Sequence, residues 1–240
     1  MAQKAITRAM PCANCQCPFY ELPGQDTTLL EADLHCMITD AVKQISFRKG
    51  EVLFNRGEES SHLYALTQGV VKICCISPDG HEQIVGISSP GNMLVGLQSI
   101  NDDCYQYAAI AATEGSACKI SHRAMLARAR DHSDLSLRLI NALNAQLAHS
   151  RKLMRVMGHK CAAAKIASFI SLIVPHPECL DHSFKLPFSR MEMAGLLGLS
   201  EETVCRQMAR LKRNGVIHAP RGRIKILDWD RLRVVAEEAA

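Results

Sequence analysis

Long apolar runs are missing from this sequence, and their absence argues against two classes of protein. No stretch approaches the roughly 18 uncharged apolar residues that a membrane-spanning helix needs. The first residues, MAQKAITRAMPC, carry charge but lack the apolar centre of a secretion signal. We therefore expect a soluble, cytoplasmic protein with no membrane partner.

Groups that would indicate catalysis are missing as well. The sequence shows no hydrolase triad, no phosphate-binding loop and no pair of carboxylates placed for acid–base chemistry. One alternative is a thiol redox protein that uses Cys12-x-x-Cys15, but the βαβ context that this motif needs is not present. We therefore expect that the protein is not an enzyme.

Cysteine, in contrast, is abundant, with 11 residues. In a reducing compartment, clustered cysteines indicate metal or redox chemistry more often than structural disulfides. The densest group is Cys12, Cys15 and Cys17, which lie within six residues in a proline-flanked segment. Thiolates this close together can bind a single metal centre, and a fourth ligand would come from elsewhere in the chain.

Positive charge is concentrated at one end of the chain. Residues 160–240 hold 13 Lys and Arg against 9 Asp and Glu, whereas residues 1–159 hold 15 of each kind. The whole net charge of +4 therefore lies in the last third of the sequence. A local basic excess fits a polyanionic partner such as nucleic acid.

Changes in residue pattern divide the chain into four segments. Residues 1–28 are a cysteine-bearing start, and residues 29–122 are a β-rich domain. A long helix at 123–160 and a compact helical unit with a hairpin at 161–240 follow. The β-rich segment consists of short apolar runs separated by glycines, which indicates an antiparallel sandwich or barrel. Asp79-Gly80 predicts a hairpin turn within it. We therefore predict an α+β fold.

The expected long helix carries an apolar stripe. Its members step alternately by three and four residues, which is the pattern of a coiled-coil seam. The stripe could instead pack on its own domain, but the length and position of the helix favour a seam between two copies of the chain. The seam residues are Ile140, Leu143, Leu147, Ser150, Met154 and Met157.

Near the C-terminus, Ser189–Ile217 predicts a helix-turn-helix. Ser189 and Glu192 have the spacing of a capping box, which begins a first helix. Gly198 permits a tight turn, and Ser200 can cap a second helix. Two short helices around a glycine turn are the framework of many DNA-binding domains.

The second helix has one apolar face and one polar face. Its polar face presents Glu202 and Arg206 near the start, where glutamate can accept from cytosine N4 and arginine can bond guanine O6 and N7. A hairpin wing follows. A helical hairpin with ordinary surface charges is the alternative, but the caps, turn, face and wing together favour DNA binding. The candidate DNA-binding residues are Ser200, Glu202, Cys205, Arg206, Arg210, Arg213, Arg221 and Arg223.

The stretch LGLSEETVCRQMARLKRNGVI resembles the recognition region of the cyclic-AMP receptor/FNR regulators, and the resemblance covers nearly the whole chain. It implies an N-terminal β-roll (a cyclic-nucleotide-binding-like jelly roll), a dimerisation helix and a C-terminal winged helix-turn-helix. It also implies a homodimer on palindromic DNA with TTGA-type half-sites, in which Glu202 and Arg206 read a G·C pair. Cys205 stands just before Arg206, where members of the family usually carry serine or glycine. By the same resemblance, the loop Ser77–Gln83 contacts RNA polymerase.

Members of this family that bind cyclic nucleotides carry a glutamate and an arginine that hold the phosphate. Here Leu97 stands at the position of the glutamate, and Tyr105 and Gln106 cover that of the arginine. No arginine occurs between Arg56 and Arg123. Because a buried phosphate would lack charge compensation, we expect no cyclic nucleotide.

FNR-like members instead hold an iron–sulfur cluster with a cysteine triplet and a distant fourth cysteine. The resemblance implies that Cys12, Cys15, Cys17 and Cys118 hold such a cluster, with 4Fe-4S favoured. The triplet is tighter than is usual in the family, which leaves 2Fe-2S or zinc as alternatives. The resemblance thus implies a transcription regulator that responds to oxygen, redox state or nitric oxide.

Two further alternatives remain open. The fourth ligand could be Cys36 or Cys104. A cluster-free member of the same family would sense a small molecule or haem in the β-roll, and His62, His81 and Met93 are the candidate haem ligands.

Overall fold

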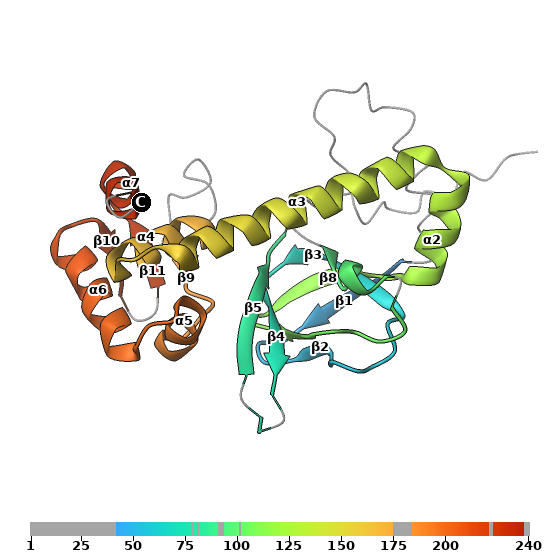
Figure 1. Cartoon of the computed structure of the whole chain (residues 1–240), viewed down its shortest axis with the longest axis horizontal. Helices are drawn as coiled ribbons and strands as arrows, with labels where there is room; N and C mark the ends of the chain where they lie inside the picture. The colour runs from blue at the N-terminus through green and yellow to red at the C-terminus, as the bar shows by residue number, and fades with distance from the viewer. Residues whose placement is uncertain are drawn as a thin grey trace, which may run out of the picture.

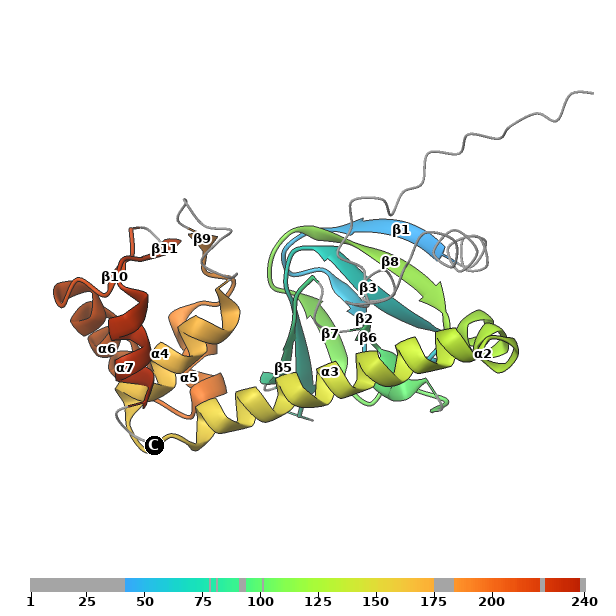
Figure 2. The ribbon, with the colours of Figure 1, turned by 90° about the horizontal axis from the view of Figure 1, so that it is seen from above.

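The computed structural model describes residues 42–77, 79–80, 82–90, 94–100, 102–174, 184–220 and 223–237. These residues form two domains joined by one long helix, α3 (Ser133–Gly158) (Figure 1). Figure 2 shows α3 running past the first domain toward the second. The predicted α+β fold is confirmed, because a β-roll precedes the long helix and a winged helix-turn-helix follows it. Among the described helices, none combines the length and apolar character required to cross a bilayer.

The first domain consists of two four-stranded antiparallel sheets. In order across the first sheet, the strands are β1 (Val42–Phe47), β8 (Gly115–Ser121), β3 (His62–Gln68) and β6 (Leu94–Val95). Across the second sheet they are β2 (Val52–Phe54), β7 (Ala108–Ala111), β4 (Val71–Ile76) and β5 (Glu82–Ser88). A short 3-10 helix, η1 (Leu97–Ser99), follows β6. The two sheets form the sandwich that the glycine-separated runs predict.

The hairpin between β4 and β5 has the turn predicted from Asp79-Gly80. The Gly80 N–H donates to the Ser77 carbonyl over 2.9 Å, and Gly80 has a φ of +82°. Residues with side chains rarely adopt this left-handed region, so glycine lets the chain reverse here.

The interior of the roll is built around three aromatic rings. The rings of Phe54 and Tyr105 stack with their centroids 3.8 Å apart, and the ring of Tyr64 lies 5.7 Å from that of Phe54. Phe47, aliphatic side chains such as Leu66 and small side chains such as Ala117 belong to the same buried cluster. The centre of the roll is therefore a packed hydrophobic core.

Helix α2 (His122–Asp131) packs against β8, and α3 shares a buried cluster with β3 and β8 of the first sheet. A second buried cluster joins Cys118 of β8 to Leu135 and Leu139 of α3. The helical region is interrupted at His132, which has an extended backbone with φ −130° and ψ 103°. The N-terminal part of α3 is therefore anchored to the sheet that contains Cys118.

The second domain combines four helices with a small antiparallel sheet of order β10-β11-β9 among the described residues. Its elements are α4 (Ala162–Ile173), β9 (Phe184–Lys185), α5 (Arg190–Leu197), α6 (Glu201–Arg213), β10 (Ile217–His218), β11 (Arg223–Ile226) and α7 (Trp229–Glu237). Its core contains Phe169 and Phe188, whose ring centroids lie 5.8 Å apart. Helix α4 packs against α6 and α7, so it supports both the helix-turn-helix and the C-terminal helix.

The two domains share one buried apolar cluster. Ile84 and Ile87 of β5 belong to it together with Leu196 of α5 and Leu153 of α3. Strand β5 and helix α5 are neighbours at this contact. The helix-turn-helix therefore packs directly on the β-roll as well as on the long helix.

Candidate nucleic-acid interface

The first helix of the helix-turn-helix begins at the capping box predicted from the sequence. The Ser189 hydroxyl accepts from the Glu192 N–H over 3.1 Å, and the Glu192 carboxylate accepts from the Ser189 N–H over 2.8 Å. Each bond satisfies an N–H group that the helix leaves without a backbone partner. Caps of this kind stabilise a helix by about 1 kcal/mol.

The turn between α5 and α6 is held by groups near and far in the sequence. Gly198 adopts the left-handed conformation with φ +63°, and the Leu199 N–H donates to the Ala194 carbonyl over 2.9 Å. The Lys165 ammonium, from α4, donates to the Leu197 carbonyl over 2.9 Å. It thereby satisfies an end carbonyl of α5. Sequence reasoning missed Lys165, because nothing local indicates a contact across 32 residues.

The second helix, α6, begins at Ser200 as predicted. The Ser200 hydroxyl accepts from the Thr203 N–H over 3.2 Å and lies 2.8 Å from the Thr203 hydroxyl. Glu201 and Glu202 occupy the first turn, where the helix dipole favours negative charge. The hydroxyl of Ser200 thus has a structural task beside the DNA contact expected of it.

Helix α6 has the two faces that its sequence predicts. Val204, Met208 and Leu211 are buried against the rest of the domain. The predicted reading residues, in contrast, are solvent-exposed; they are Glu202, Cys205, Arg206, Arg210 and Arg213. The structure therefore brings together an exposed, mostly basic face on one helix.

Glu202 and Arg206 are neighbours on that face. The Glu202 Oε1 atom and the Arg206 Nη1 atom lie 3.7 Å apart, with the two side chains 86% and 62% exposed. An exposed pair like this contributes little to stability, so both groups remain available to the edges of base pairs.

The wing is formed by β10 and β11. Ile217 pairs with Ile226 and His218 with Lys225 in an antiparallel register. Arg223 is exposed at the start of β11. Arg221, the other basic residue predicted on the wing, lies outside the described residues.

The predicted metal ligands are only partly described. Cys118 lies on β8 and is 7% exposed. Cys12, Cys15 and Cys17 lie outside the described residues. Within the part of the chain that the structure describes, no three His, Cys, Asp or Glu side chains are grouped to hold a metal ion.

Cys118 is the one proposed cluster ligand within the described residues. Its soft sulfur donor belongs to an apolar cluster with Leu139 and Ala142 of α3, which limits access of water. Of the alternative fourth ligands, Cys104 is exposed, and Cys36 lies outside the described residues.

Two of the three residues at the expected positions of the phosphate-holding glutamate and arginine are buried. Leu97 is 2% exposed and Tyr105 is 4% exposed. The Tyr105 hydroxyl accepts from the His62 N–H over 3.0 Å and also donates to the His62 carbonyl. Gln106 is exposed at the surface.

Of the candidate haem ligands, His62 lies within the described residues. The His62 Nδ1 atom lies 2.8 Å from the Ser61 hydroxyl. Burial, together with Lys119 and His122, lowers the pKa of His62. His81 and Met93 lie outside the described residues.

Comparisons with known proteins agree with this architecture. Residues 44–132 match the model of the cyclic nucleotide-binding domain, and residues 164–235 match that of the Crp-like helix-turn-helix domain. The first model describes a fold shared by many proteins and does not by itself show that this chain binds a nucleotide.

The similarity to individual proteins extends along most of the chain. The chain is 34% identical to a probable transcriptional activator of Rhizobium leguminosarum over 181 residues, 74% of each chain. It is 28% identical to the transcriptional activator protein Anr of Pseudomonas aeruginosa over 98% of each chain. The solved structure of FixK2 from Bradyrhizobium japonicum has a similar fold, with a TM-score of 0.72, 24% identity and coverage of 83% of this chain and 99% of that one. This chain therefore belongs to the Crp/FNR family of DNA-binding transcription regulators.

Proposed function

We propose that the protein is a homodimeric, FNR-type regulator switched by a cysteine-ligated iron–sulfur cluster that responds to oxygen, redox state or nitric oxide. The observation that carries this proposal is the place of Cys118, a buried thiol in the cluster of side chains beneath the expected dimer helix. Members of the family regulate transcription and are not enzymes, and we place this one in the cytoplasm.

The exposed stripe on α3 supports the dimer. Ile140, Leu143, Leu147 and Met154 are between 44% and 56% exposed, and Met157 is 38% exposed. Leaving such a row of large apolar side chains in water is unfavourable, so we expect a second copy of the chain to bury it.

A neighbouring face of α3 packs on the domains of its own chain. Leu135, Leu139, Leu153 and Val156 are buried there. This division favours a seam between subunits over the alternative that the stripe packs within one chain. Ser150 is half-buried within the stripe.

A path of contacts leads from the candidate ligand to the dimer seam. Cys118 and Leu139 share a buried cluster, and Leu139 lies one helical turn before Leu143 of the seam. A change in how β8 packs on α3 therefore alters a helix whose other face meets the partner subunit. The distance between the two recognition helices depends on that packing, and it must match the spacing of two half-sites.

Cys12, Cys15 and Cys17 are the remaining ligands that we assign, by resemblance to the FNR branch. A bound iron–sulfur cluster would supply a thiolate-ligated group that oxygen and nitric oxide attack. The four cysteines would hold this group, and the apolar side chains around Cys118 would keep water from its sulfur. 4Fe-4S is favoured, with 2Fe-2S and zinc as alternatives.

The DNA target is proposed from the reading face of α6. Glu202 and Arg206 would contact a G·C pair in each TTGA-type half-site of a palindrome, while Arg210, Arg213 and the wing would contact phosphates. By resemblance, the loop Ser77–Gln83 would contact RNA polymerase.

Binding of a cyclic nucleotide is not part of this proposal. Tyr105 is fixed by its bonds to His62 and by its stack on Phe54, and the sequence has no arginine between Arg56 and Arg123 to balance a phosphate.

The deciding experiment is purification without oxygen, followed by counts of iron, sulfide and zinc and by an absorption spectrum. We expect iron and acid-labile sulfide, with broad charge-transfer absorption that is lost in air. A sharp Soret band would support the haem alternative, and zinc without sulfide would support a zinc site. Protein without any metal would contradict the proposal.

A further inference from the structure

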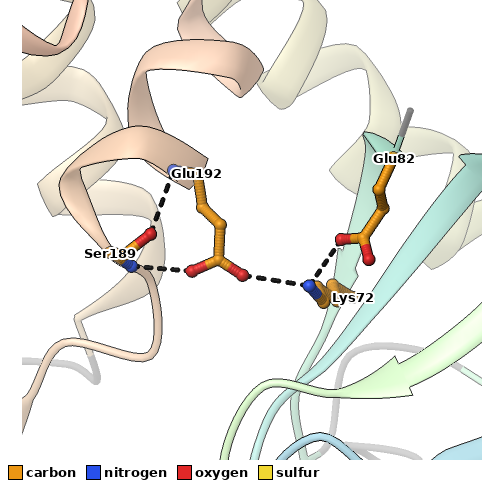
Figure 3. A network of polar contacts seen from close by, with 4 residues as sticks. All are labelled: Lys72, Glu82, Ser189 and Glu192. Atoms are coloured by element: carbon orange, nitrogen blue, oxygen red, sulfur yellow. Dashed lines mark hydrogen bonds and ion pairs between the residues drawn. The ribbon is translucent and has the colours of Figure 1, made fainter. Parts of the chain in front are cut away.

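Lys72 joins the two domains through an ion pair. It lies on β4, and its ammonium is 2.5 Å from a carboxylate oxygen of Glu82 on β5 and 3.0 Å from one of Glu192 on α5 (Figure 3). The Lys72 side chain is only 11% exposed, so its charge depends on these two partners.

Glu192 has two tasks at once. One carboxylate oxygen accepts from Lys72 of the β-roll, and the other accepts from the Ser189 N–H in the capping box. The group that begins the first helix of the helix-turn-helix is therefore the same group that contacts the other domain.

The electrostatics favour the charged forms of the pair. Burial alone would lower the pKa of Lys72, but the two carboxylates outweigh it and raise that pKa. Burial alone would raise the pKa of Glu192, but its bonds to Ser189 and Lys72 outweigh it and lower that pKa. Removing either partner would leave a partly buried charge without its main counter-charge.

The ion pair favours one relative orientation of the two domains, which the apolar contact alone does not. The shared cluster of Ile84, Ile87 and Leu196 holds the domains together, but apolar contacts are non-directional and tolerate sliding. A charged hydrogen bond has a preferred geometry. A cleft of about 810 Å³ lies beside the pair, lined in part by Glu82 and Met191, so the domains are not fully packed there.

The orientation that results leaves the reading face free. Helix α5 packs against α6 and leads into it through the Gly198 turn, so the angle of α5 sets the angle of α6. Glu202 and Arg206 remain 86% and 62% exposed in this orientation. The β-roll therefore does not cover the side chains expected to read DNA.

We propose that Lys72 is a positioning residue for DNA recognition, which through Glu192 sets the angle between the helix-turn-helix and the β-roll. In a dimer, this angle contributes to the separation of the two recognition helices, which must match half-sites about one helical turn apart. The inference rests on the proposed dimeric binding of a palindrome. The contact between Lys72 and Glu192 would affect DNA recognition although neither residue touches DNA.

The test compares three variants on three duplexes. The variants are Lys72→Met, Glu192→Gln and the double change, and glutamine keeps an acceptor for the capping box. The duplexes are the palindrome, the same palindrome with its half-sites one base pair further apart, and a single half-site. The control is Lys43→Met, which removes an exposed lysine of β1.

We expect each single variant to bind the palindrome about tenfold more weakly, a change of about 1.4 kcal/mol. The preference for correct spacing should shrink, while affinity for the single half-site stays within about twofold. The double variant should be no weaker than either single variant, because both remove one interaction. Lys72→Arg should restore the spacing preference, and the Lys43→Met control should resemble the wild type.

Unchanged spacing preference in both single variants would overturn the role of Lys72. An equal loss on the half-site and the palindrome would also overturn it, since that result indicates damage to the domain itself. If Lys72→Met does not fold, Glu192→Gln decides alone. A wild-type chain that does not prefer the palindrome at all would instead overturn the proposed function.

Discussion

Cys118 of β8 and Leu139 of α3 lie in one buried cluster, although they belong to different layers of the first domain. The sulfur thus belongs to the same cluster as one face of the helix whose neighbouring face carries the expected dimer seam. This relationship links the predicted signal site to the predicted dimer, and each part of the link can be tested separately.

Cys118→Ala should reduce the iron content of protein purified without oxygen, because the proposed cluster would lose its fourth ligand. Cys74→Ala is the matched control, since Cys74 is also buried and burial raises the pKa of its thiol to about 12. We expect iron and sulfide to fall in the first variant and to stay unchanged in the second. Identical metal content in wild type and Cys118→Ala would show that Cys118 is not a ligand.

Leu147→Glu should convert the dimer to a monomer, because it places a charge in the middle of the exposed apolar stripe. Leu147 is 47% exposed in the single chain, so the change should not disturb the fold of the monomer. Ala145→Glu, two residues earlier and also exposed, faces away from the stripe and should remain dimeric. Analytical ultracentrifugation separates the two cases, and a Leu147→Glu dimer as tight as the wild type would contradict the seam.

Arg206→Ala should weaken binding to the palindrome by about 1–3 kcal/mol per half-site and relax specificity at one base pair. Arg213→Ala should weaken binding to specific and random duplexes alike. It should also reduce the slope of log affinity against log salt concentration by about one, the value for one phosphate contact. Affinity measured on both duplexes at several salt concentrations distinguishes the two roles. Equal losses on both duplexes for Arg206→Ala would argue against base reading.

The β-roll should lose stability as the pH falls below neutral, because His122 is buried. Burial lowers the pKa of His122, against the opposing effect of the Ser60 carbonyl that lies 2.9 Å from its Nδ1 atom. The unfolded chain then binds more protons than the folded chain below the ordinary histidine pKa of about 6.5. Stability is therefore fully present above that pH and declines as the pH approaches the lowered value.

The measurement for this prediction is urea unfolding at pH 7.5, 6.5 and 5.5. His122→Phe should give a smaller decrease in stability over this range than the wild type. His218→Gln, a change at an exposed histidine, should keep the wild-type slope. A His122→Phe protein with an unchanged slope would assign the pH dependence to other groups.

Local patterns made the helix-turn-helix predictable. The capping box at Ser189 and Glu192, the turn at Gly198 and the cap at Ser200 each depend on residues that are close in sequence, and all three features are present. The alternating faces of α6 follow from helical periodicity, which is also a local property. Changes in residue pattern also indicated the order of the segments, and the resemblance implied their identity as β-roll, dimerisation helix and winged helix-turn-helix.

Contacts between distant residues were not predictable in the same way. Lys72 and Glu192 are separated by 120 residues, and no periodic or turn signal relates them. The interruption at His132 is likewise unmarked by proline or glycine in the sequence. Such features depend on how whole domains pack, so the structure was needed to find them.

The central claim is that metal-loaded protein reads a palindrome through α6. Its most direct test is the affinity of protein purified and kept without oxygen for a palindromic duplex with TTGA-type half-sites, compared with a random duplex at the same salt concentration. The account predicts a preference of about 1,000-fold or more, which declines after exposure to air. Equal affinity for the two duplexes, in protein shown to carry its metal, would contradict it.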